Sequence, residues 1–354
     1  MSALAARAKL PQSTLLRSLA LVVVTGAVLL LLSTFILGPF DNLDLASGAF
    51  YFAVLAGLTM LAGLSGQISL GHGALMAVGA YTVALLIGNE GWALVPALVA
   101  ASLVTTIVGI PVGVAASRLR GPYLAGATLA LAVGLPALAD KFPGTFGGEN
   151  GLTLNPPTPP SFLGANFPLE RWEAWVACAG ALVVLFVIWN LIHSGLGRSM
   201  RAVRDEEIAS ALCGLRVGRT QAFAFTLSAA CAGLGGGLLA LVLQLAQPGA
   251  FPLQLSLSLL TGIVIGGLGS LGGAAWGAAL LVLLPRWTTD LSHSFSLSNN
   301  VSSNLPLAVY GVVLIGAMLV WPSGIQGGVR ALVGWAARAR GSREESKPDQ
   351  QEQA

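Results

Sequence analysis

The sequence predicts an all-α protein that crosses a membrane many times, and two observations carry this prediction. Of the 354 residues, 55% are hydrophobic and 9% are charged, whereas soluble domains carry about 25% charged residues. The 45 residues between Asp44 and Glu90 include no charged side chain. As one helix they would span roughly 68 Å, over twice the hydrocarbon core of a bilayer. This stretch is therefore predicted to form two passes joined by a break.

The other membrane-spanning segments follow in order along the chain. The first, 19–37, is longer than the core of a signal peptide, so it is predicted to be a retained helix. After the two passes within 45–89, the further uncharged segments are 92–116, 122–139, 174–192, 222–243, 253–284 and 305–321. Segment 253–284 is again too long for one pass and is rich in glycine, so a second glycine-broken hairpin is expected. The total is about ten helices, or eight or nine if a broken stretch re-enters the membrane.

The basic residues predict which ends of the helices face the cytoplasm. With a cytoplasmic N-terminus, 15 of the 18 Lys and Arg residues fall on the cytoplasmic side, where such residues are in excess in membrane proteins. Lys141, Arg171 and Arg286 are the exceptions. Both termini are thus predicted to be cytoplasmic. The expected parts are a cytoplasmic N-terminus (1–18), a membrane domain (19–330) with an external loop (141–173) and a cytoplasmic segment (193–221), and a polar cytoplasmic tail (331–354).

The first break, at residues 63–73, is a polar, glycine-rich sequence that we call the elbow. It reads Gly-Leu-Ser-Gly-Gln-Ile-Ser-Leu-Gly-His-Gly. The charge distribution predicts that it lies on the cytoplasmic side, with both flanking passes opening outward. Polar backbone at the depth of lipid is tolerated only where it is buried in protein or lines an aqueous path, so the elbow is predicted to border a transport route. The candidate residues are Ser65, Gly66, Gln67, Ser69, Gly71, His72 and Gly73. The alternative interpretation is that the glycines serve helix packing and the polar groups cap helix ends.

The sequence lacks the residues and motifs that would indicate ion coupling, ATP hydrolysis or metal binding. Every Asp and Glu lies in a loop or at the edge of a predicted span, which argues against energy coupling through an intramembrane carboxylate. No phosphate-binding Gly-x4-Gly-Lys-Ser/Thr motif occurs, and the three cysteines lack metal-binding spacing. We therefore expect a conduit with no catalytic residue, cofactor, metal or ATPase site.

One cytoplasmic stretch, 199–214, has apolar and charged residues at helical spacing. The apolar residues are Met200, Val203, Ile208, Ala211 and Leu215, and the charged ones are Arg201, Arg204, Asp205, Glu206 and Glu207. Gly214 is a natural residue to follow the helix end. An interfacial helix attracted to anionic lipid is one interpretation, but lipid of that kind would repel the acidic run 205–207. A helix that docks in a groove of a protein partner fits better.

Five stretches resemble one family in order and spacing. They are 63–81, 201–214, 224–236, 266–273 and 310–324, and together they cover the chain from about residue 47 to 330. They resemble the branched-chain amino acid ABC-transporter permeases of the LivM type. The resemblance implies a subunit of the bacterial plasma (inner) membrane that has no ATPase of its own. It also implies a heterodimer with a sister permease, two cytoplasmic ATP-binding subunits and an external binding protein that delivers the substrate.

In such a permease the stretch 201–214 would be the coupling helix that docks on an ATPase. The residues expected to act there are Arg201, Arg204, Glu206, Glu207, Ala209 and Gly214. The sequence departs from the Glu-Ala-Ala-x3-Gly pattern of many importers, because Ile208, Ala209 and Ser210 stand in the first three places. Which of these residues contact the ATPase is therefore left open.

The function predicted is inward translocation of branched-chain or related hydrophobic amino acids by alternating access driven by separate ATPases. Import of urea or short amides is an alternative, because related permeases with a similar elbow serve those solutes. A stand-alone channel or ion-coupled carrier is a further alternative.

Overall fold

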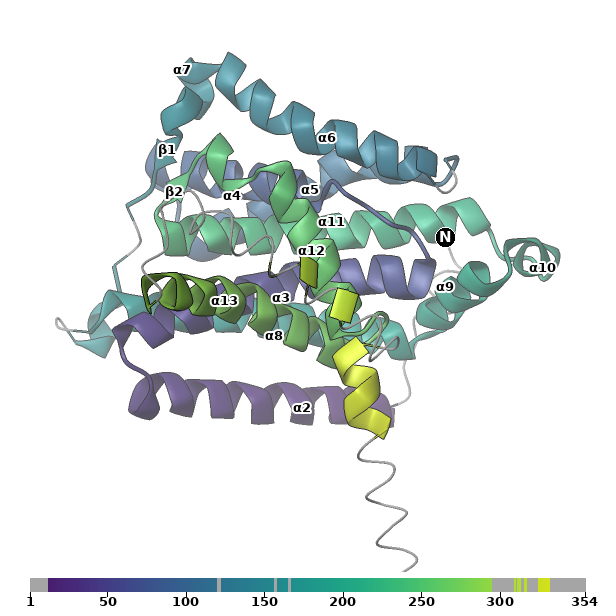
Figure 1. Ribbon diagram of the computed structural model, residues 1–354, viewed down its shortest axis with the longest axis horizontal. Coiled ribbons are helices and arrows are strands. Elements are labelled where there is room, and N and C mark those ends of the chain that lie inside the picture. Colours follow the sequence, from purple (N-terminus) through teal and green to yellow (C-terminus); the bar gives the residue numbers. More distant parts are fainter. Residues whose placement is uncertain are drawn as a thin grey trace, which may run out of the picture.

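The computed structural model describes residues 12–119, 122–155, 158–164, 167–294, 309, 311–312, 315–316 and 324–331. Long helices lie side by side across the molecule (Figure 1). Two short helices, α9 and α10, project from one end, which we call the α9 end. A small two-stranded sheet lies at the opposite end, which we call the sheet end.

The longer α-helices of the described chain are α2 (Gln12–Leu31), α3 (Pro39–Ser65), α4 (His72–Gly88), α5 (Leu94–Ala116), α6 (Pro122–Lys141), α8 (Leu169–His193), α9 (Gly195–Asp205), α11 (Val217–Leu243), α12 (Leu253–Gly266) and α13 (Leu271–Ser294). The shorter elements are η1 (Leu32–Ile36), α7 (Pro143–Phe146), η2 (Gly148–Asn150), β1 (Leu152–Thr153), η3 (Ser161–Leu163), α10 (Glu207–Leu212), β2 (Leu245–Ala246) and η4 (Pro248–Ala250).

The predicted all-α membrane fold is confirmed. Within the described residues, seven helical segments are long and apolar enough to cross a membrane, and His72–Gly88 is a shorter apolar helix. Helix α13 has 24 residues and is not one of these seven segments. The predicted last span, 305–321, lies almost wholly outside the described residues. The total of eight to ten spans and the cytoplasmic termini stay predictions.

Helices α3 and α11 form the centre of the bundle. Each has 27 residues, and they pack antiparallel: Gly57 of α3 meets Cys231, and Val54 meets Gly235. A Cβ atom added at Gly57 would lie only 2.7 Å from that of Cys231. Small residues thus let the two helices approach closely, as is common in membrane proteins. By contrast, α2 and α6 lie at opposite edges of the bundle (Figure 1), and few residues of α2 are fully buried.

Both predicted glycine-broken hairpins are present as pairs of helices. The first consists of α3 and α4, and the second consists of α12 and α13. Gly267 and Gly269 interrupt the second hairpin, with φ values of +121° and +80°, which lie in the region that favours glycine. The two breaks touch each other, because a Cβ atom added at Gly63 would lie 2.2 Å from the backbone nitrogen of Gly269.

A third interruption follows α11, at the sheet end. Helix α11 ends at Gln244, which has a left-handed φ of +56°. Residues 245–252 then contain β2 and η4 before α12 begins. Strand β2 pairs antiparallel with β1 from the predicted external loop, with Leu152 opposite Ala246. The loop 141–173 therefore includes ordered elements that are fastened to the bundle.

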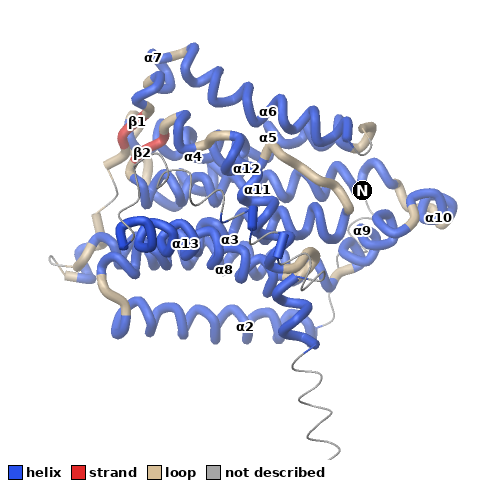
Figure 2. Tube along the Cα trace, in the orientation of Figure 1, coloured by secondary structure: helices blue, strands red, loops and turns tan. Residues whose placement is uncertain are grey.

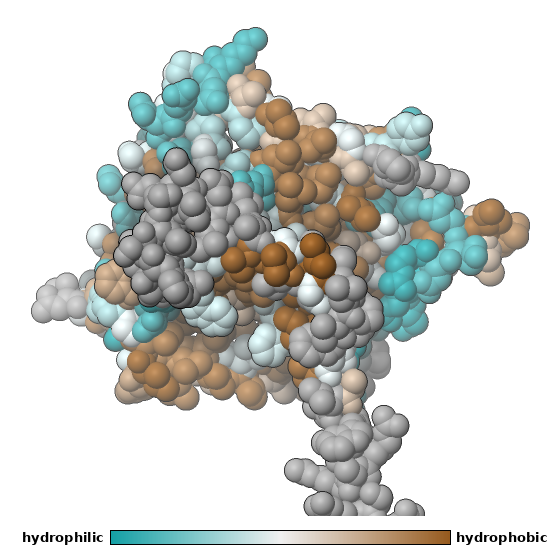
Figure 3. Space-filling model, viewed as in Figure 1, coloured by the Kyte–Doolittle hydropathy of each residue, from teal (hydrophilic) through white to brown (hydrophobic). Residues whose placement is uncertain are grey.

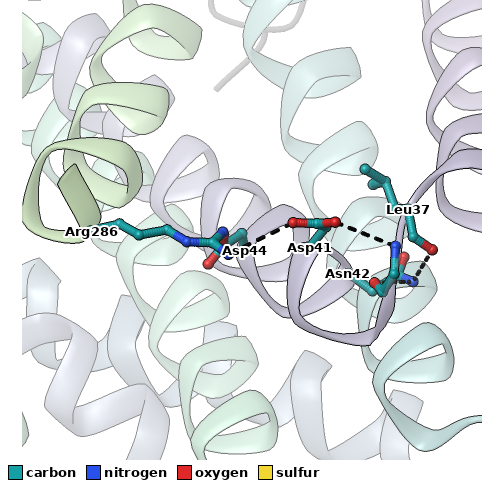
Figure 4. A network of polar contacts seen from close by, with 6 residues as sticks. Leu37, Asp41, Asn42, Asp44 and Arg286 are labelled. Atoms are coloured by element: carbon teal, nitrogen blue, oxygen red, sulfur yellow. Dashed lines mark hydrogen bonds and ion pairs between the residues drawn. The ribbon is translucent and has the colours of Figure 1, made fainter. Parts of the chain in front are cut away.

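An ion-pair network at the sheet end accounts for one exception to the expected charge distribution. Arg286 of α13 forms ion pairs with Asp44 and Asp41 near the start of α3 (Figure 4). In the same region, Asn42 donates hydrogen bonds to the carbonyl oxygens of Gly38 and Leu37. Two carboxylates thus balance the charge of this basic residue locally at the sheet end.

Candidate functional site

The break between α3 and α4 is shorter than the predicted elbow, covering residues 66–71, and part of it lies deep in the bundle. Helix α3 ends at the α9 end, where Gly66 takes a φ of +72° and its N–H donates to Leu61. Residues 67–71 then run back alongside the helices before α4 begins (Figure 2). Only the first part of the elbow therefore lies at the end of the bundle. Ser69, Gly71, His72 and Gly73 lie among the helices, because the chain turns back into the bundle before α4 starts. The cytoplasmic location of the elbow stays a prediction.

His72, the first residue of α4, is completely buried and joins the elbow to α11. One ring nitrogen, Nδ1, lies 3.0 Å from the hydroxyl of Ser69, and the other, Nε2, lies 2.7 Å from that of Ser228. Ser228 is the twelfth of the 27 residues of α11, about 17 Å along that helix. The start of α4 therefore lies well inside the bundle.

The N-terminal ends of the two short helices α4 and α12 meet beside His72. The backbone N–H of Gly73, at the start of α4, donates to the hydroxyl of Ser256, in the first turn of α12 (3.0 Å). On another side, the N–H of Leu70 donates to Thr128 of α6 (3.0 Å). Because each helix N-terminus carries a partial positive charge of about half an elementary unit, their meeting creates a region inside the bundle that favours an anionic group.

Two polar side chains of the elbow are buried without a hydrogen-bond partner among the described residues. Gln67 is 5% exposed and Ser65 is 3% exposed. Neither the amide oxygen and nitrogen of Gln67 nor the hydroxyl of Ser65 has a partner there. Buried polar atoms of this kind are rare and call for an explanation such as water or a ligand. Within the described part of the chain, these are buried polar groups of the elbow whose hydrogen-bonding capacity is unused.

Ser228, Ser256 and Thr128 are site residues that the sequence analysis does not identify. Each is a single hydroxyl in an apolar helix, and such residues often bond only to their own helix backbone. No motif marks them, and only the packing of α6, α11 and α12 brings them to the elbow.

The predicted single amphipathic helix at 199–214 is wrong, because two helices form. Helix α9 ends at Asp205, and Glu206 is extended, with φ −152° and ψ 100°. A short helix, α10, follows. Gly214 then takes the left-handed φ of +82°. The extended residue changes the chain direction, so the apolar residues of 199–214 do not share one face.

The two halves of this segment bury different residues. Met200 and Val203 of α9 are fully buried against the bundle. Ile208 and Leu212 of α10 are 75% and 85% exposed, and an apolar tip projects beside the polar surface of α9 (Figure 3). These two residues lie one helical turn apart. An exposed apolar pair on a projecting tip is typical of a surface that binds another protein.

Three of the charged residues predicted to act in this segment bond to the chain itself. Arg201 donates to the carbonyl oxygen of Ile192 (3.3 Å). Glu207 accepts from Gln221 (2.8 Å). Arg204 bonds to Asp205 and, through Nη1, to the carbonyl oxygen of Gly63. Two more of the predicted residues, Glu206 and Ala209, are exposed near the apolar tip.

Arg204 connects α9 directly to the elbow. Its side chain caps the last turn of α3 through Gly63, and its Cγ atom would lie 2.8 Å from a Cβ atom added at Gly66. Helix C-terminal carbonyls lack partners within the helix and favour cationic groups. Arg204 thus forms a direct contact between the elbow and the segment that carries the apolar tip.

Comparison with known proteins gives one family. Residues 42–320 match the family described as "Branched-chain amino acid transport system / permease component". The sequence is 32% identical to the high-affinity branched-chain amino acid transport system permease protein LivM of Salmonella typhimurium, covering 71% of this chain and 64% of that protein. It is 25% identical to LivH of Escherichia coli, covering 79% and 92% of the two chains. No solved structure matches.

The match to LivM leaves about a third of that relative uncovered, whereas the family match includes the elbow, α9, α10 and both broken hairpins. The seven candidate spans and the bacterial relatives agree with a multi-pass protein of the bacterial plasma membrane. Since the matched region comprises most of its length, this chain belongs to the family of branched-chain amino acid transport permease components.

Proposed function

We propose that this protein is the membrane-spanning subunit of an ATP-driven importer for branched-chain or related hydrophobic amino acids. The observation that carries the proposal is the meeting of the α4 and α12 N-termini at the elbow, which also contains a buried Gln67 with no hydrogen-bond partner among the described residues. A zwitterionic amino acid needs both charged groups satisfied during passage. The helix N-termini suit its carboxylate, and the oxygens of Gln67 and Ser65 suit its ammonium group. The small and apolar residues around the elbow suit a branched side chain.

In this proposal the protein has no ATPase site and works with several partners. These are a sister permease, with which it forms a heterodimer, two cytoplasmic ATPase subunits and an external amino-acid-binding protein. The α9 end, with its arginines, faces the cytoplasm. The tip of α10 docks in a groove of one ATPase through Ile208 and Leu212, with Glu206, Ala209 and Gly214 beside them. Movement of α9 then reaches the elbow through Arg204, and the bundle changes from outward to inward access.

Uptake by the reconstituted complex tests this function. The full-length chain is purified with the subunits encoded beside it, placed in liposomes, and supplied with the cognate binding protein and internal or external ATP. We expect ATP-dependent uptake of radiolabelled leucine, isoleucine or valine. Uptake of urea or a short amide instead would replace the amino acid as substrate. ATP-independent flux through this chain alone would show a channel or carrier and overturn the proposal.

The docking surface is tested separately from transport. Ile208→Ser with Leu212→Ser removes the exposed apolar pair without touching a buried contact. We expect the ATPase subunits no longer to co-purify, while the thermal stability of the permease is unchanged. Cys213→Ser, at a neighbouring exposed position, is the matched control and keeps the ATPase bound. If the double variant retained the ATPase fully, α10 would not be the docking site.

A further inference from the structure

A large cavity lies between α3 and the helices α2, α8 and α13, and only Gly269 and Ser270 bring it near the elbow. It has a volume of about 930 Å³ and is bounded by α2, α3, α8 and α13. Its walls are mostly apolar, with Leu21 of α2, Phe52 of α3, Leu185 of α8 and Val282 of α13 among them. Because α2 is exposed along most of its length, this groove borders the lipid phase rather than the centre of the bundle.

The two ends of the groove differ in charge. At the α9 end it is lined by His193, Arg201 and Arg330, with the amide side chain of Gln326 beside them. The lining residue Asp44 lies about 20 residues earlier along α3 than the elbow, which places it roughly 30 Å away at the sheet end. There Asp44 is paired with Arg286. The groove therefore offers two arginines at one end and no acidic lining residue near them.

The arginines keep donors available for a ligand. Arg201 uses Nη2 to bond to the carbonyl oxygen of Ile192, but a guanidinium has five N–H donors. Arg330 comes from the other side of the groove, in the C-terminal segment 324–331, and is exposed. Two guanidinium groups at the mouth of an apolar groove match the chemistry of a phosphate joined to hydrocarbon chains. Basic pockets of this kind between transmembrane helices bind anionic lipid headgroups.

We propose that this groove binds an anionic phospholipid whose phosphate contacts Arg201 and Arg330 and whose acyl chains lie along α2, α3 and α8. The lipid occupies the leaflet at the α9 end. Gly48 of α3 lines the groove, and a Cβ atom added there would meet nothing within 4 Å. That open space is where an acyl chain passes. The bound lipid fills the space between α2 and α8 and holds the end of α8, from which α9 starts.

Native mass spectrometry of the full-length protein, released from nanodiscs containing equal amounts of phosphatidylglycerol and phosphatidylcholine, tests the proposal. We expect the wild type to retain phosphatidylglycerol preferentially. Arg201→Gln with Arg330→Gln should lower that retention by roughly thirtyfold, because each of the two basic residues near an anionic headgroup contributes about 1 kcal/mol. Arg198→Gln with Arg216→Gln removes the same charge from exposed residues outside the groove and should leave retention unchanged.

A second pair of variants tests the acyl-chain path without changing charge. Gly48→Leu fills the groove and should displace the lipid, whereas Gly134→Leu, at a similarly open position on α6, should not. Equal retention of both lipids by the wild type, or equal losses in test and control variants, would overturn the proposal. So would full competition by inorganic phosphate, which would indicate a site for the free anion. Displacement of a co-purifying protein by Gly48→Leu, with lipid unchanged, would assign the groove to a subunit interface.

Discussion

The breaks that follow α3 and α11 have a similar backbone geometry but contact different parts of the molecule. Both helices have 27 residues, both end in a left-handed residue, and both lead through an extended segment to a shorter helix. They run in opposite directions, so one break starts at the α9 end and the other at the sheet end. The short helices α4 and α12 consequently meet N-terminus to N-terminus.

The difference between the two breaks lies in what holds them. The break after α3 contacts Arg204 of α9 and contains Gln67, which has no hydrogen-bond partner among the described residues. The break after α11 is held by pairing of β2 with β1 and by a hydrogen bond from Gln244 to Glu173. The first break is thus attached to α9 in addition to α6, α11 and α12, and the second is attached to the loop that contains β1. Of the two, the first is the break that directly contacts the segment with the exposed apolar tip.

The largest expected effect comes from closing the space at Gly63. In α11 the corresponding position is Leu241, so only the first break depends on glycine there. A Cβ atom at Gly63 would collide with the backbone of Gly269, so Gly63→Ala should destabilise the fold by about 3 kcal/mol. Gly134→Ala, in open space on α6, should instead stabilise by up to about 1 kcal/mol. Thermal unfolding in detergent compares the two; similar melting temperatures would contradict the tight contact between the breaks.

Two buried residues of the first break, His72 and Gln67, are expected to differ in their effects on stability and on uptake. His72→Ala loses two hydrogen bonds inside the bundle, which should lower stability by about 2 kcal/mol. Gln67→Ala removes atoms that have no partner among the described residues, so stability should be kept while amino-acid uptake falls about tenfold. Melting temperature and uptake are measured for both. Normal uptake by Gln67→Ala would indicate that the elbow serves helix packing and not transport.

Loss of the contact between α9 and the elbow should have a smaller effect. The Arg204 side chain is 44% exposed, so its bond to Gly63 is expected to contribute only about 1 kcal/mol. Arg204→Gln should reduce uptake several-fold while ATP hydrolysis continues. Arg198→Gln, on the same helix and exposed, is the control. A parallel fall in hydrolysis and uptake would show that Arg204 acts on ATPase docking instead.

The smallest effect is expected at the residue that ends α11. Gln244→Gly relieves a left-handed conformation that costs about 1 kcal/mol but loses the bond to Glu173, so stability should change by less than about 0.5 kcal/mol. At the matching place after α3, Gly66→Ala adds that strain and crowds Arg204, and should cost about 1–2 kcal/mol. Chemical denaturation of both variants measures the asymmetry. Equal costs would mean that the two breaks are held alike.

The existence of the first break follows from the sequence, whereas its depth does not. An uncharged run of 45 residues cannot be one pass, and glycines mark where it breaks. The path of 67–71 back into the bundle depends on Thr128, Ser228 and Ser256, which lie far away in sequence. Such contacts between distant segments leave no local pattern. The break at Glu206 could not be predicted either, because a run of acidic residues is compatible with a continuous helix.

The interruption at Glu206 has a consequence for protein engineering. Helix α9 anchors to the bundle through Met200 and Val203, while the six residues of α10 bear the exposed apolar pair. Anchor and contact surface are thus encoded in separate, adjacent stretches. Under the proposed function, exchanging the exposed residues of α10 for those of a relative, while keeping Glu207 and the buried Ser210, would transfer recognition without altering how α9 and α10 are seated. Such an exchange of a few residues would allow one transport system to be given the partner subunits of a related system.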